Sequence, residues 1–71
     1  MTKEEAETLK PGDIISCAGN GYRTLTKVWI EDPNLCWNQK GNGNTKHEYE
    51  LVNIDIVSRY EPPVINNYQI Y

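Results

Sequence analysis

The pattern of apolar and polar positions predicts a chain of short β-strands. The longest predicted strand runs from residue 22 to 31, and its apolar side chains change phase along it. Thr24, Thr26, Val28 and Ile30 fall in one phase, whereas Leu25 and Trp29 fall in the other. We expect a bend or bulge near Leu25–Lys27, because small closed sheets need one to curve.

Four shorter strands are expected on either side of it. They cover residues 13–18, 35–38, 46–51 and 55–60, and the alternation is clearest in 46–51. There His47, Tyr49 and Leu51 share one face. A single helical turn is expected over residues 52–54, before the last strand. Glycine- or proline-containing turns separate the predicted strands at 11–12, 19–21, 32–34 and 41–44.

The first ten residues predict a helix of about two turns. Thr2 and Glu5 have the spacing of a capping box, in which a hydroxyl caps the helix and a carboxylate three residues later bonds back. Ala6 and Leu9 lie on one helical face, and Pro11 ends the segment. So short a helix needs packing partners, so we expect these two side chains to cover one open end of the sheet.

Two stretches of the chain resemble an SH3-like small β-barrel. The likeness rests on the residues from Pro11 to Ile15 and from Tyr49 to Val57, and spans roughly Lys10 to Glu61. The first predicted hairpin is very short, so the chain resembles Tudor-like or bacterial small barrels more than a polyproline-binding SH3 domain. The fold class expected is mainly β, a five-stranded SH3-like barrel with an N-terminal helix. An OB fold and an irregular α+β fold are the alternatives.

The 71 residues are expected to form a single domain. It would comprise a short helix (1–10), the barrel (11–61) and a C-terminal tail (62–71). The tail carries Val64, Ile65, Tyr68, Ile70 and Tyr71, too many apolar residues for a typical disordered segment. We expect it to pack on the barrel or to dock on a partner or a second copy.

Charge is uneven along the chain. The net charge is −3 at pH 7. Residues 1–18 carry −2, residues 19–47 carry +2 and residues 48–71 carry −3. This acidic balance disfavours a general nucleic-acid binder. No signal peptide or membrane-spanning stretch is expected, so the predicted location is the cytoplasm, or the host cytoplasm if a phage encodes the chain. Cys17 and Cys36 are expected to be free thiols.

The residue types give little support for catalysis. Cys17, Cys36 and the single histidine, His47, are the candidate nucleophiles and base, and we expect His47 to be a partly buried packing residue instead. One histidine and two widely spaced cysteines do not make a structural zinc site. The sequence therefore predicts a non-enzymatic protein with no metal and no cofactor.

Aromatic residues occur about once per predicted strand. Trp37 and Tyr49 are expected in the core, whereas Tyr22 and Trp29 are expected nearer the surface. The second pair lies among basic residues and gives the one candidate nucleic-acid face, although an ordinary solvated strand face is the favoured interpretation. That alternative face comprises Tyr22, Arg23, Lys27, Trp29, Lys40 and Lys46.

The favoured prediction is a protein–protein interaction module with no membrane partner. It extends to a phage or mobile-element accessory protein that inhibits a host defence enzyme by occupying a basic cleft. The candidate partner-binding residues are acidic or in the tail, namely Glu48, Glu50, Asp55, Glu61, Tyr68 and Tyr71. Self-association through the tail or a barrel edge is a further expectation.

Overall fold

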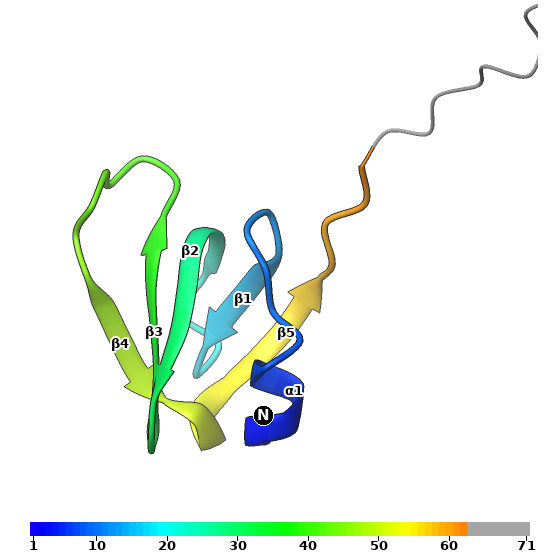
Figure 1. Cartoon of the computed structure of the whole chain (residues 1–71), viewed down its shortest axis with the longest axis vertical. Helices are drawn as coiled ribbons and strands as arrows, with labels where there is room; N and C mark the ends of the chain where they lie inside the picture. The colour runs from blue at the N-terminus through cyan, green and yellow to red at the C-terminus, as the bar shows by residue number, and fades with distance from the viewer. Residues whose placement is uncertain (63–71) are drawn as a thin grey trace, which may run out of the picture.

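The computed structural model describes residues 1–62, which form one five-stranded antiparallel sheet and a short helix (Figure 1). The strands are β1 (Ile14–Cys17), β2 (Tyr22–Glu31), β3 (Asn34–Gln39), β4 (His47–Glu50) and β5 (Ile54–Ser58). The helical segments are α1 (Lys3–Ala6) and the 3-10 turn η1 (Leu51–Asn53). The predicted class, mainly β with five strands and a short N-terminal helix, is confirmed. The tail from residue 63 onward lies outside the described residues.

The sheet is open and does not close into the predicted barrel. Its strand order is β4-β3-β2-β1-β5, so that β5 returns to pair with β1. β4 and β5 are therefore the two edge strands, and within residues 1–62 no ladder joins them. β2 belongs to both halves of the sheet, since it pairs with β1 through Tyr22–Thr24 and with β3 through Leu25–Glu31. The register shifts between Leu25 and Lys27, which confirms the predicted bulge.

The core lies on the inner side of the sheet, beneath α1 and η1. Its most enclosed side chains include Ile15, Leu25, Leu35 and Ile54, each at most 1% exposed. Trp37 is buried as predicted. The core prediction for Tyr49 is wrong, because Tyr49 is 38% exposed. Tyr49 lies opposite Leu35, as the alternation requires, but within residues 1–62 no strand pairs with the far side of β4 to cover it.

The helix α1 is shorter than the sequence predicts. The capping box forms as expected, with Thr2 N–H donating to the Glu5 carboxylate and Glu5 N–H donating to Thr2 Oγ1. The helical pattern stops at Ala6 because the next turn tightens. There Thr8 N–H and Leu9 N–H donate three residues back, and the Thr8 hydroxyl donates to the Glu5 carbonyl at 2.6 Å. Ala6 and Leu9 are both buried, as predicted.

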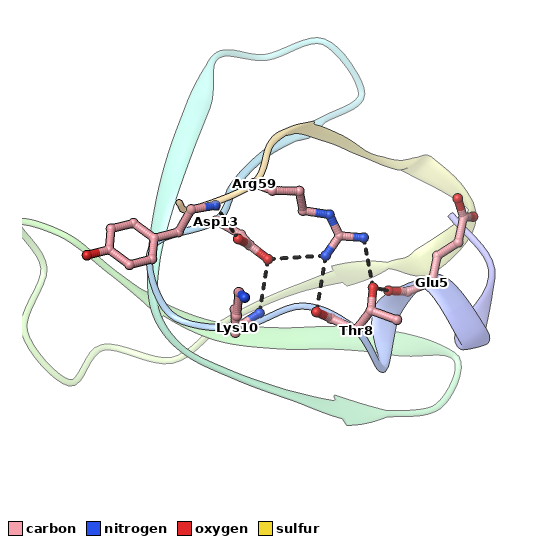
Figure 2. Close-up of polar contacts among 6 residues, drawn as sticks. Glu5, Thr8, Lys10, Asp13 and Arg59 are labelled. Carbon is pink, nitrogen blue, oxygen red and sulfur yellow. Dashed lines mark hydrogen bonds and ion pairs between the residues drawn. The ribbon is translucent and has the colours of Figure 1, made fainter. Parts of the chain in front are cut away.

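A buried carboxylate fixes the chain on both sides of the β1–β5 pair (Figure 2). Asp13 is fully buried and accepts three hydrogen bonds. They come from Tyr60 N–H at 2.7 Å, Lys10 N–H at 3.1 Å and the Arg59 guanidinium at 3.3 Å. Because Tyr60 N–H bonds to Asp13, β5 ends at Ser58 rather than at the predicted residue 60. We call this group, residues 10, 13, 59 and 60, the Asp13 clamp.

Two neighbouring residues, Thr8 and Gly12, contact members of the Asp13 clamp. The Arg59 guanidinium also donates to the Thr8 carbonyl at 3.1 Å and to the Thr8 hydroxyl at 2.7 Å. Gly12 has φ +97°, and a Cβ built there would lie 2.6 Å from the Tyr60 ring. Glycine is therefore needed at this position for two reasons, the left-handed backbone and the close approach of Tyr60.

Candidate partner-binding surfaces

Segments that are far apart in the sequence meet around η1, at one end of the molecule (Figure 1). The Met1 amino group donates to the carbonyls of Leu51 and Ile54, both at 2.7 Å, which places α1 beside η1. Leu51 N–H donates to the Pro33 carbonyl at 3.0 Å, which adds the β2–β3 turn. Ala18 N–H donates to the Asn53 carbonyl at 2.8 Å, which adds the β1–β2 turn.

Carboxylates gather at this end. We define the acidic end by its six exposed acids, Glu4, Glu5, Glu7, Asp32, Glu50 and Asp55. Two basic residues, Lys3 and Arg23, and the positively charged Met1 amino group accompany them, so its net charge is −3. The other four acids and five bases of the chain lie elsewhere and sum to +1. The acidic end therefore holds most of the negative charge of the chain, and the remaining side chains are together nearly neutral.

The structure divides the four predicted partner-binding acids into two pairs. Glu50 and Asp55 flank η1 at the acidic end. Glu48 lies on β4 and accepts from Asn34 Nδ2 at 3.0 Å, and Glu61 lies beyond β5. Tyr68 and Tyr71 lie outside the described residues. The acids of α1 and Asp32 were missed by the sequence analysis, because only the folded topology brings them beside Glu50 and Asp55.

The predicted nucleic-acid face does not assemble as one basic surface. Tyr22 and Arg23 follow each other in β2, so their side chains point to opposite sides. The Arg23 guanidinium is held by the carbonyls of Asn20 and Gly21 in the β1–β2 turn. Lys40 lies beyond β3, in the loop that leads to β4. Lys27 and Trp29 do meet, with the Lys27 ammonium 5.3 Å from the indole centroid.

Acidic partners neutralise the remaining lysine of that face. Lys46 Nζ lies 3.1 Å from Glu31 Oε1 and 3.9 Å from Glu48 Oε2. The Trp29 indole N–H donates to Glu31 Oε2 at 2.7 Å. That hydrogen bond, followed by the one from Lys46, holds the pKa of Glu31 below its ordinary value. The bond to Glu31 likewise raises the pKa of Lys46. We call residues 29, 31, 46 and 48 the outer network.

Both cysteines are free and buried, but in different surroundings. Cys17 belongs to the hydrophobic core. Cys36 lies on the outer face of the sheet, between its register partners Trp29 and Glu48, and is 0% exposed. Burial raises the pKa of both thiols, which is the opposite of what an activated nucleophile requires.

His47 does not pair with a thiol. It lies opposite Trp37 in the β3–β4 ladder, and its ring stacks on the indole with centroids 5.9 Å apart. Since Cys36 precedes Trp37 in the strand, its side chain points to the other face. The predicted role of His47 as a partly buried packing residue is confirmed. Residues 1–62 hold no pocket and no cluster of three or more potential metal ligands.

Comparison with protein-family models, with characterised proteins and with solved structures gives no match to this chain. Within the part of the chain that the structure describes, no helix is long and apolar enough to cross a membrane.

Proposed function

We propose that this chain is a non-enzymatic protein–protein interaction module that presents its acidic end to a basic site on a partner protein. The observation that carries the proposal is the gathering of six exposed acids around η1, drawn from four separate segments of the chain. Oppositely charged surfaces speed association and select partners. The raised pKa values of both thiols and the stacking of His47 on Trp37, on the face of β3 opposite to Cys36, support a role without catalysis.

We further propose that the fold is an SH3-like sheet of the Tudor-like or bacterial type. Three features support this assignment: the meandering strand order, the return of β5 to β1, and the single 3-10 turn between β4 and β5. Binding modules are common among such small β folds, since their function depends on loops and edges that vary around a constant sheet.

The proposal extends to an accessory protein of a phage or mobile element that inhibits a host defence enzyme. An acidic surface on a small rigid scaffold could block a basic substrate cleft by occupying it. We propose the cytoplasm as the site of action, because both cysteines are free thiols. A protein partner is proposed first, and self-association through the tail or a sheet edge remains a prediction.

The test is affinity capture of the tagged full chain from host lysate, with and without nuclease, using two matched double variants. Glu50→Gln with Asp55→Asn removes two charges from the acidic end, and Glu48→Gln with Glu61→Gln removes two charges elsewhere. We expect the first variant to weaken capture about tenfold and the second to change it less than about twofold. Capture should also weaken as salt rises.

Two results would overturn the proposal. Equal capture by the two double variants would show that the acidic end does not bind the partner. Capture that disappears with nuclease, and that depends on Lys27 and Trp29, would instead support the nucleic-acid face.

A further inference from the structure

The most exposed large apolar side chain of the described residues stands in the middle of the acidic end. Val52, the central residue of η1, is 79% exposed. A single exposed apolar residue is ordinary on a protein surface. What distinguishes Val52 is the rigidity of its support and the charge around it.

The three residues of η1 are fixed from three directions. Leu51 is buried in the core, and its N–H donates to Pro33 while its carbonyl accepts from Met1. Asn53 accepts from Ala18 N–H, and the Ile54 carbonyl accepts a second bond from the Met1 amino group. Val52 therefore projects from a short turn that cannot relax easily. A turn whose backbone is held in place before binding loses little conformational entropy on binding.

The surrounding charge limits what can cover Val52. Glu50 lies two residues before it and Asp55 three residues after it, and the acidic end as a whole carries −3 with the Met1 amino group included. Pairing this surface with that of a second copy would bring two acidic ends together. An anionic membrane would be repelled in the same way. A partner site with positive charge around an apolar centre would complement both the carboxylates of the acidic end and Val52.

We infer that Val52 is the apolar anchor of the acidic end, and that its occupant is a partner site with a shallow apolar socket bordered by lysine or arginine. This inference rests on the proposed function and adds the chemistry of the partner. Interfaces commonly concentrate affinity in a central desolvated side chain, whereas charges at the rim guide approach. In this division of roles, Val52 sets how long the complex lasts and the carboxylates set how fast it forms.

The test uses two synthetic peptides with the same number of lysines, one with a central pair of leucines and one with a central pair of serines. Each is titrated into the full chain, and binding is followed by NMR of the Val52 methyl groups and the η1 amides. We expect the leucine peptide to bind at least about threefold more tightly and to shift the Val52 methyls. Val52→Ser should remove this preference, whereas Val57→Ser, an exposed valine of β5, should keep it.

Equal affinity for the two peptides, or a preference that survives Val52→Ser, would overturn the inference. Failure of the proposed function would look different. In that case neither peptide would lose affinity in the Glu50→Gln, Asp55→Asn variant, because the carboxylates would not be involved. A peptide preference that depends on Val57 rather than Val52 would also overturn the inference, by moving the anchor to β5.

Discussion

The Asp13 clamp and the outer network both join oppositely charged side chains, but their surroundings differ. Asp13 is fully buried and satisfied by two backbone N–H groups as well as by Arg59. Glu31 and Lys46 are about half exposed, and they lie on the outer face of the sheet. Removing one partner from a buried set leaves other groups unsatisfied, whereas water replaces a lost partner at the surface. The clamp should therefore act on the whole fold, and the outer network only on its neighbourhood.

The largest effect is expected from Asp13→Ala. Its two backbone donors would be left without an acceptor, and Arg59 would lose its carboxylate. We expect a loss of about 3 kcal/mol in the free energy of unfolding, measured by urea denaturation. The matched surface variant Glu48→Ala should change this free energy only marginally. A similar small change for Asp13→Ala would show that the clamp does not stabilise the fold.

Gly12→Ala should have the next largest effect and lower the free energy of unfolding by about 2 kcal/mol. The new methyl group would collide with the Tyr60 ring, in a backbone conformation that disfavours side chains. Gly41 is a close control. It has the same φ of +97°, but no other part of residues 1–62 lies within 4 Å of the position that its Cβ would occupy. The difference in unfolding free energy between Gly12→Ala and Gly41→Ala isolates the contact with Tyr60. Equal losses would mean that only the backbone conformation matters.

Thiol labelling would separate the global effect from the local one. Asp13→Ala should speed the labelling of Cys17 and Cys36 together, because both become reachable when the whole fold opens. Glu48→Ala should speed the labelling of Cys36 and leave Cys17 unchanged, since Glu48 lies opposite Cys36 in the β3–β4 ladder, where burial and also the Glu48 charge raise the pKa of that thiol. Mass spectrometry after timed labelling measures both rates. Parallel changes at the two thiols in Glu48→Ala would mean that the outer network also supports the core.

The smallest expected effect is on acid stability. Because the folded-state pKa of Glu31 is lowered, first by the Trp29 indole, its contribution is present above the unfolded-state pKa and is lost as pH falls through the folded-state value. In Trp29→Phe the donor is gone, so the pKa of Glu31 should rise toward its ordinary value. Carbon-detected NMR titration of the carboxyl group measures this directly. An unchanged pKa would assign the shift to Lys46 instead.

The sequence predicted what depends on neighbouring residues. The strand from Tyr22 to Glu31, its bulge and the capping box of Thr2 and Glu5 follow from local periodicity and hydrogen bonding. The exposure of Tyr49 was not predicted, because alternation places its side chain on the inner face but does not show that β4 is an edge strand. The acidic end also escaped prediction, because Glu4, Asp32 and Glu50 meet only through the topology.

The position of the Asp13 clamp has a mechanical consequence. β1 and β5 run antiparallel with Ile14 opposite Ser58, so the chain enters one strand and leaves the other at the same end of their ladder. Tension between the two flanking segments would open this ladder like a zipper, one hydrogen bond at a time. Asp13, Arg59 and Tyr60 lie just outside the first pair. Tension applied through the residues beyond Pro62 must therefore break the hydrogen bonds from Arg59 and Tyr60 to Asp13 before it reaches the β1–β5 ladder.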